Sequence, residues 1–153
     1  MPTLPFPDLR TLCSSGAAQY GGRVAGQHGA RRITYAELFA CAERFGAQLR
    51  SQGLRQGDFA VLMMENSLAY MVALFAVFAA GAVAVPINAD TPASELDTIL
   101  SDCGPRVLIT RERIVARLGK KVEGLKIVVV ASPIEIDGAA FGGTGVEGPV
   151  LEP

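Results

Sequence analysis

The sequence has no tryptophan, a single histidine and only three cysteines among its 153 residues. The cysteines are widely spaced and form no CxxC pair, which argues against a disulfide framework and against a zinc site. The lone His28 has no partner residues with which to build a metal site. No nucleophile and base can be paired from the sequence either, so we predict no metal ligand and no catalytic residue in this chain.

An excess of charge of one sign is also lacking, because 14 basic and 15 acidic residues give a formal net charge of −1. This balance does not drive binding to nucleic acid or anionic lipid, so we predict no nucleic-acid partner. The first residues contain prolines and an acid where a signal peptide needs a basic start and an apolar run. Together with the sparse cysteines, this predicts a cytoplasmic protein.

One long stretch, residues 66–89, carries no charge at all. The mostly apolar residues 68–87 within it are numerous enough to cross a bilayer as a helix. However, Gly81 suits the position just after a helix, and the β-branched run that follows it is expected to end at Pro86. No basic cluster flanks the stretch to orient a span. We therefore predict a buried helix and a buried strand without a membrane span, and keep a membrane-anchored protein as an alternative.

Helix caps and apolar runs alternate along the middle of the chain. Thr34 and Glu37 have the spacing of a capping box. Thr91 is expected to cap a later helix with Pro92 at its first position, and Thr110 is expected to open the next one. The predicted elements are a helix over 9–20, a hairpin of 24–27 and 31–34, and strands over 59–64, 82–85, 107–109 and 127–130, each strand preceded by a helix.

Nearly all-apolar strands joined by crossover helices are typical of a parallel sheet that is buried on both faces. We therefore predict an α/β fold with a doubly wound, mostly parallel sheet of βαβαβαβ order, an N-terminal arm and a small hairpin. The predicted domains are the arm over 1–23, the α/β unit over 24–131, and a flexible Gly/Pro linker over 132–153. The linker has no lysine or arginine beside its glycines, which argues against a phosphate loop there.

Ligands of such sheets usually bind beyond the carboxyl ends of the strands. Two acids and three other polar residues stand at those ends and form the candidate crevice: Glu65, Asn66, Asn88, Asp90 and Thr110. They are suited to touch a ribose, a metal ion or a neighbouring segment. Alternatively, the amides satisfy loop backbone and the acids are solvated. The five basic residues within 111–121 are expected to form a solvated face rather than an anion site.

Five short motifs occur in one order over about residues 24–130: ITYAEL at 33–38, GLRQGD at 53–58, ENS at 65–67, AGAVAVPIN at 80–88, and the segment 96–109. Together they resemble the adenylate-forming enzymes, a family that comprises the acyl-CoA synthetases, the luciferases and the nonribosomal-peptide adenylation domains. Asn88 and the pair Glu95 and Leu96 look most like the acyl-CoA synthetases, whereas Asp90 stands where some CoA-forming members carry a basic residue.

The resemblance implies a parent protein that condenses a carboxylate with ATP and Mg²⁺ and then forms a thioester with CoA. The family's reactive residues normally follow this region. We therefore expect an N-terminal fragment that is scaffold, is inactive alone, holds no cofactor and has the remainder of the ligase as its partner. Its uncovered apolar surface is expected to cause self-association. The alternatives are a stand-alone nucleotide- or protein-binding module and a fragment of a peptide-synthetase adenylation domain.

Overall fold

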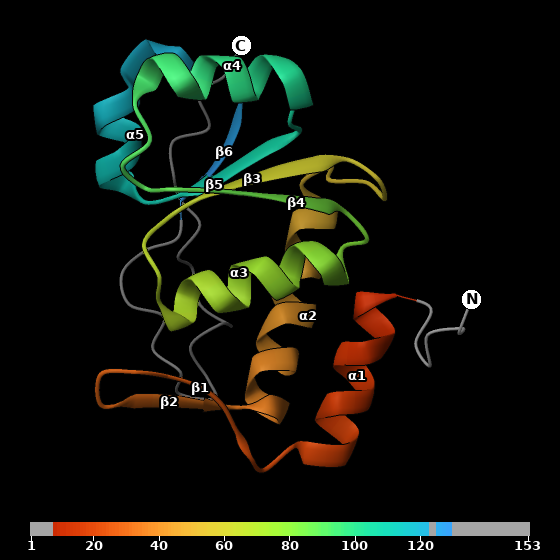
Figure 1. Ribbon diagram of the computed structural model, residues 1–153. Coiled ribbons are helices and arrows are strands. Elements are labelled where there is room, and N and C mark those ends of the chain that lie inside the picture. Colours follow the sequence, from red (N-terminus) through yellow and green to blue (C-terminus); the bar gives the residue numbers. More distant parts are fainter. Residues whose placement is uncertain (1–7, 123–124, 130–153) are drawn as a thin grey trace, which may run out of the picture.

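A parallel sheet of four strands in the order β4-β3-β5-β6 organises the structure, a computed structural model that describes residues 8–122 and 125–129. Two helices, α2 and α3, cover one face, and α4 and α5 cover the other (Figure 1). The predicted α/β, doubly wound parallel fold is thus confirmed. The sheet elements are β3 (Phe59–Met63), α3 (Leu68–Ala79), β4 (Val83–Ile87), α4 (Ala93–Cys103), β5 (Val107–Thr110), α5 (Glu112–Leu118), the 3₁₀ turn η1 (Gly119–Val122) and β6 (Lys126–Val129).

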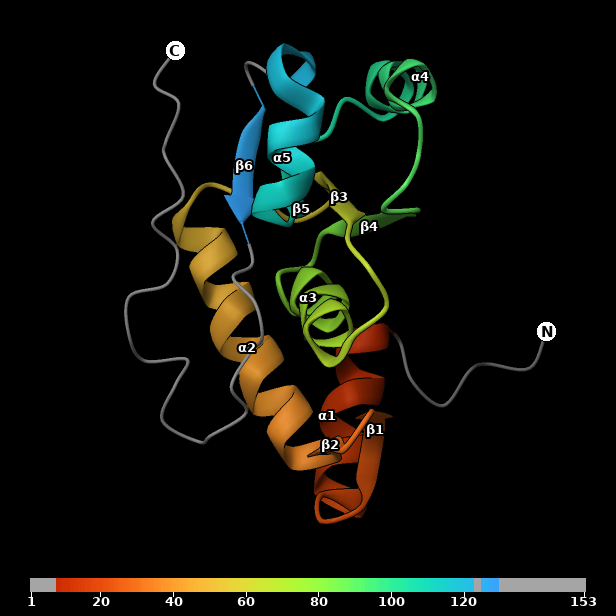
Figure 2. The same ribbon diagram turned by 90° about the vertical axis from the view of Figure 1, so that its left-hand side faces the viewer.

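The elements before α2 (Tyr35–Ser51) pack against α2 and α3 rather than against the four-stranded sheet (Figure 2). They are α1 (Leu9–Tyr20) and the antiparallel pair β1 (Val24–His28) and β2 (Arg31–Thr34). An ion pair of 3.2 Å between Arg10 Nε and Glu43 Oε1 joins α1 to α2. The predicted arm therefore contains a packed helix within its described residues. The predicted linker, 132–153, lies outside the described residues.

The helices begin where the sequence supplies side-chain caps. Thr34 and Glu37 form the predicted capping box at the start of α2, with the Thr34 N–H donating to Glu37 Oε2 at 2.8 Å. Ser67 caps α3 by accepting from the Tyr70 N–H at 3.1 Å. Gly104, at a φ of +51°, ends α4 in the left-handed conformation that glycine adopts without penalty. Among the described helices, none combines the length and the apolar character that crossing a bilayer requires.

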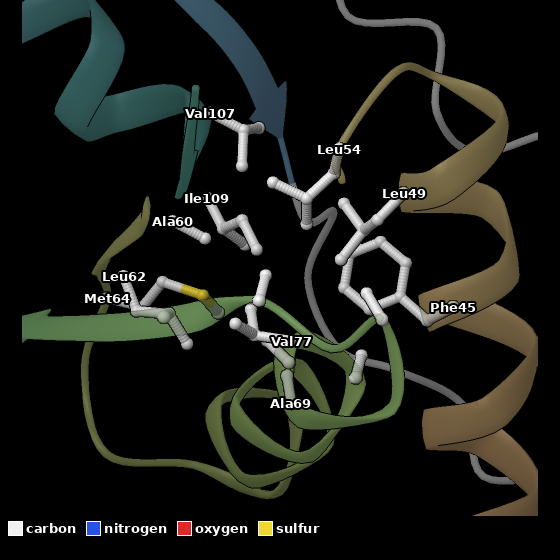
Figure 3. Close-up of a cluster of buried hydrophobic side chains, with 14 residues drawn as sticks. Phe45, Leu49, Leu54, Ala60, Leu62, Met64, Ala69, Val77, Val107 and Ile109 are labelled. Carbon is white, nitrogen blue, oxygen red and sulfur yellow. The ribbon is translucent and has the colours of Figure 1, made fainter. Parts of the chain in front are cut away.

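The alternation of side chains along β3 divides the core into two layers. Ala60 and Leu62 face α2 and α3, where they meet Phe45 and Val77 in a cluster that continues to β5 (Figure 3). On the opposite face, Val61 and Met63 meet Leu96, Ile114 and Leu118, which lie on α4 and α5. Because β3 is buried on both faces, the helices on either side of the sheet pack against the same strand.

The outer strand β4 differs from the prediction in two ways. Pro86 does not end the strand but lies within it, opposite Leu62 of β3. The Val83 N–H donates to the Asp58 carbonyl at 2.8 Å, on the side of β4 that faces β3. Backbone groups alternate in direction along a strand, so the backbone nitrogens of Ala84 and Pro86 lie on the outer side of β4, away from β3. A proline without an N–H is tolerated there because nothing in the ladder needs its donor. Burial on both faces is also wrong for β4, since Val83 is 43% exposed at the edge of the sheet.

Two predicted helix starts are wrong. The residue before α4 is Pro92 and not Thr91, which is buried in the preceding loop. Thr110 is the last residue of β5, and Arg111 precedes α5. Threonine is favoured both at helix N-caps and in strands, so its identity alone did not decide between the two positions.

Candidate functional site

A pocket of about 470 Å³ opens at the carboxyl ends of β3 and β4. It contains both amide and carboxylate side chains from the loops that follow these strands, a tyrosine from α3, and an apolar wall. Parallel pairing of the two strands brings their ends to the same edge, which is why two loops separated by a whole helix in sequence meet here. The lining residues are Met64, Glu65, Asn66, Tyr70, Pro86, Ile87, Asn88, Ala89 and Asp90.

Four of the five predicted site residues lie in this pocket, which we call the strand-end crevice. They are Glu65 and Asn66 from the end of β3, and Asn88 and Asp90 from the end of β4. The fifth, Thr110, is fully buried, and its hydroxyl donates to the Met63 carbonyl at 2.7 Å. Thr110 therefore ties β5 to β3 and does not line the crevice.

The loop after β4 has a defined turn. Asn88 Oδ1 accepts from the Asp90 N–H at 2.9 Å, and the Asn88 carbonyl accepts from the Thr91 N–H at 3.1 Å. The side-chain carbonyl of Asn88 thus satisfies loop backbone, as one of the two alternative interpretations predicted. This turn holds Asp90 at the rim of the crevice, where its side chain is 86% exposed.

Both acids of the crevice are paired with arginines. Two of these arginines lie in α5, and the third, Arg111, directly precedes it. Glu65 Oε2 lies 3.9 Å from Arg111 Nε, and Glu65 Oε1 accepts from Arg113. Asp90 Oδ1 lies 3.6 Å from an Nη atom of Arg117, which also donates to the Ala89 carbonyl. Burial lowers the pKa of the Arg111 guanidinium below its ordinary value.

Arg113 and Arg117 are exposed, at 67% and 42%, as a solvated face predicts, although their ion pairs with the crevice acids were not predicted. The prediction is wrong for Arg111, which is 13% exposed because parallel pairing of β3 and β5 places it next to the end of β3. Lys120 and Lys121, predicted with them, have side chains outside the described part. After β3 the chain continues to α3 on one face of the sheet, and after β5 it continues to α5 on the other face. The pairs of Glu65 with Arg111 and Arg113 connect the ends of these two strands. This is the topological switch point at which ligands of open α/β sheets bind.

The described residues contain no group of three His, Cys, Asp or Glu side chains placed to hold a metal ion. None of the three cysteines lines the crevice, and all three are free thiols. Burial raises the pKa of Cys13 to about 11, which keeps its thiol protonated near neutral pH. The chemistry available in the crevice is thus hydrogen bonding by amides and a phenol, beside carboxylates already paired with arginines.

The fold and the crevice define an α/β protein with a pocket at the ends of its parallel strands. The chain belongs to the AMP-binding enzyme family, whose model matches residues 13–145. The predicted resemblance to adenylate-forming enzymes is confirmed.

Both CoA synthases and peptide synthases are among the relatives that match this chain. A feruloyl-CoA synthase of Amycolatopsis sp. is 44% identical over 86 residues, which are 56% of this chain and 18% of that protein. A linear gramicidin synthase of Brevibacillus parabrevis is 33% identical over 115 residues, which are 75% of this chain and 1% of that protein. The chain thus spans less than a fifth of the length of these relatives.

Solved structures give the same result. The O-succinylbenzoate coenzyme A synthetase of Bacillus subtilis, in complex with AMP, superposes with a TM-score of 0.71 at 26% identity, over 76% of this chain and 30% of that one. A nonribosomal peptide synthetase in an AMPPNP-bound form superposes with a TM-score of 0.77 at 26% identity, over 88% of this chain and 14% of that one.

Proposed function

We propose that this chain is the scaffold of an enzyme that activates a carboxylic acid with ATP. In the first step a carboxylate oxygen attacks the α-phosphorus of ATP, which forms an acyl-AMP and releases pyrophosphate. In the second step a thiol, which we propose is that of CoA, attacks the acyl carbon, loses its proton and releases AMP. The 153 residues contribute framework and the strand-end crevice, and are inactive alone.

The choice of CoA is supported by one observation: sequence identity is higher with the CoA synthases and CoA ligases than with the linear gramicidin synthase. Identity reaches 44% with the feruloyl-CoA synthase, and 41% over 78 residues with a long-chain-fatty-acid–CoA ligase of Mycobacterium tuberculosis. With the linear gramicidin synthase it is 33%. The motif around Asn88 supports the same choice.

Activation of a carboxylate by ATP implies Mg²⁺, and the described residues do not suit this ion. Glu65 and Asp90 are the acids of the crevice, and each is already paired with arginine. A magnesium site needs free oxygen ligands. We therefore derive no step through the ion here, and propose that ATP, Mg²⁺ and CoA are bound with the rest of the ligase. We also propose that the enzyme acts in the cytoplasm.

A second candidate, adenylation of an amino acid for peptide synthesis, is favoured by the longer alignment. The match to the linear gramicidin synthase extends over 115 residues, against 86 for the feruloyl-CoA synthase. In that case the acceptor thiol would belong to a carrier protein rather than to CoA.

The two candidates are separated by carboxylate-dependent exchange of pyrophosphate into ATP. The protein tested is the product of the complete reading frame, with panels of aryl acids, fatty acids and amino acids. Exchange with an aryl or fatty acid, followed by CoA-dependent thioester formation, supports the proposal. Exchange with amino acids alone, and no CoA thioester, supports the second candidate. Exchange catalysed by the 153-residue chain alone would show that it is not merely scaffold.

A further inference from the structure

The two acids of the strand-end crevice are both held from outside it by one short helix. Arg113 and Arg117 are one i,i+4 step apart, so they lie on the same side of α5, and they reach Glu65 and Asp90 respectively. Ile114 and Leu118, one residue after each arginine, anchor the neighbouring side of α5 in the core with residues of β3 and β5. The backbone positions of Arg113 and Arg117 are thereby fixed relative to the sheet.

Each arginine also fixes part of the crevice wall. Arg113 and Arg111 share the two oxygens of Glu65, at the end of β3. Arg117 contacts both the Asp90 carboxylate and the Ala89 carbonyl, and so holds the loop after β4 at two points. Charge-assisted bonds of this kind are stronger than neutral ones. Solvent screens the pair of Arg111, which is only 13% exposed, less than the pairs of Arg113 and Arg117, which are 67% and 42% exposed.

The consequence is a crevice whose acids carry little uncompensated negative charge. Its remaining polar residues are Asn66, Asn88 and Tyr70, and the apolar Pro86 and Ile87 also line it. Amides and a phenol recognise uncharged polar groups by hydrogen bonds. Without the arginines, the same pocket would present two carboxylates and attract cations.

We propose that Arg113 and Arg117 are positioning residues that make the strand-end crevice selective for uncharged polar ligand groups, such as the hydroxyls of a ribose or a carboxamide, and against metal cations. This inference rests on the proposed use of the crevice as a ligand site. Its test does not depend on adenylation activity, so that loss of one proposal leaves the other standing.

The test uses Tb³⁺ alone as a cation probe, because its luminescence is sensitised by a nearby tyrosine and Tyr70 lines the crevice. The purified chain is titrated as wild type and as R113Q/R117Q. We expect Tb³⁺ affinity to rise at least fivefold in R113Q/R117Q, with luminescence that disappears when Tyr70→Phe is added. Adding E65Q/D90N should return the affinity to the wild-type value, which loss of structure would not do.

The matched control is Arg10→Gln, which frees Glu43 of another exposed ion pair, on α1 and α2, outside the crevice. Arg10→Gln should not increase the Tb³⁺ luminescence that depends on Tyr70. Equal Tb³⁺ affinity in wild type and R113Q/R117Q, or a gain that persists after E65Q/D90N, would overturn the proposal.

A second variant decides the question if R113Q/R117Q does not fold. E65Q/D90N alone leaves the arginines uncompensated, and is expected to bind inorganic pyrophosphate at least fivefold more tightly than wild type by calorimetry. Unchanged pyrophosphate affinity in a folded E65Q/D90N protein would contradict the proposed charge compensation.

Discussion

Arg50, in the last turn of α2, donates from Nη1 to the carbonyl of Ala79 at a distance of 2.7 Å. Ala79 is the last residue of α3, and carbonyls at a helix C-terminus have no partner within their own helix. A cation is also favourable at this end of the helix dipole. One side chain therefore fixes the end of α2 to the end of α3, directly before the chain enters β4.

Replacing Arg50 by Met should lower the free energy of unfolding by about 1.5–3 kcal/mol, because a partly buried carbonyl loses its charged donor. Arg50→Lys should lower it by less, since the charge is kept. Urea denaturation measures both. Arg10→Met is the control, since its pair with Glu43 is exposed and should contribute less than about 1 kcal/mol. Equal losses in Arg50→Met and Arg10→Met would contradict the structural role of Arg50.

The capping box at the start of α2 predicts both a stability change and a pH dependence. Thr34→Ala should cost about 1 kcal/mol, whereas Thr34→Ser should retain most of the stability. Bonds from the backbone N–H and the hydroxyl of Thr34 hold the pKa of Glu37 below its usual range. The carboxylate is therefore stabilising above its unfolded pKa of about 4.3, and this contribution is lost as the pH falls through the lower folded value.

Glu37→Gln should accordingly flatten the acid limb of stability against pH and leave the curve above neutral pH parallel to wild type. Thermal unfolding monitored by circular dichroism at several pH values measures this. An unchanged acid limb in Glu37→Gln would show that the Glu37 pKa is not lowered by folding.

Gly46 lies where α2 and α3 approach each other closely. A Cβ at this position would lie 2.8 Å from the Ala76 carbonyl oxygen and 3.1 Å from the Ala79 Cβ. Gly46→Ala should therefore destabilise the protein by about 1–3 kcal/mol through overpacking, although alanine is the better helix former. Gly16→Ala in α1 is the matched helical control, because a Cβ there meets only Phe39 Cε2 at 3.7 Å, an ordinary contact distance. Denaturant unfolding in which Gly46→Ala equals or exceeds wild-type stability would refute the close contact.

Thr110→Val should lower the free energy of unfolding by about 1–2 kcal/mol, because the buried hydroxyl that donates to the Met63 carbonyl is lost without a change of shape. Thr110→Ser keeps the donor and loses only a methyl group, so it should restore part of that difference. The measurement is again chemical denaturation. If Thr110→Val were as stable as wild type, the bond between β5 and β3 would contribute nothing to stability.

The sequence predicted best those features whose cause is local. The Thr34 and Glu37 box depends on residues three apart, and the position of Gly81 just after α3 depends on its own backbone, so each was predicted without knowledge of the fold. The four crevice residues around Asn66 and Asn88 followed from the parallel order of the strands, which brings their carboxyl ends together.

The errors concern features that depend on neighbours far along the chain. Pro86 was expected to end a strand, because the sequence does not show that β4 is the outer strand of the sheet. The ion pair of Arg113 was not predicted, because its partner Glu65 is 48 residues away. Thr110 has a residue type common to caps and strands, and only the pairing of β5 with β3 decides its role.

The position of Pro86 has a further consequence for the behaviour of the chain in concentrated solution. A foreign strand that approached the outer side of β4 would meet a backbone position with no hydrogen to donate, so its ladder would be interrupted near the carboxyl end of β4. The β4 edge of the sheet therefore offers a poor template for extension by other polypeptides. A single imino acid protects this edge against fibril-like growth.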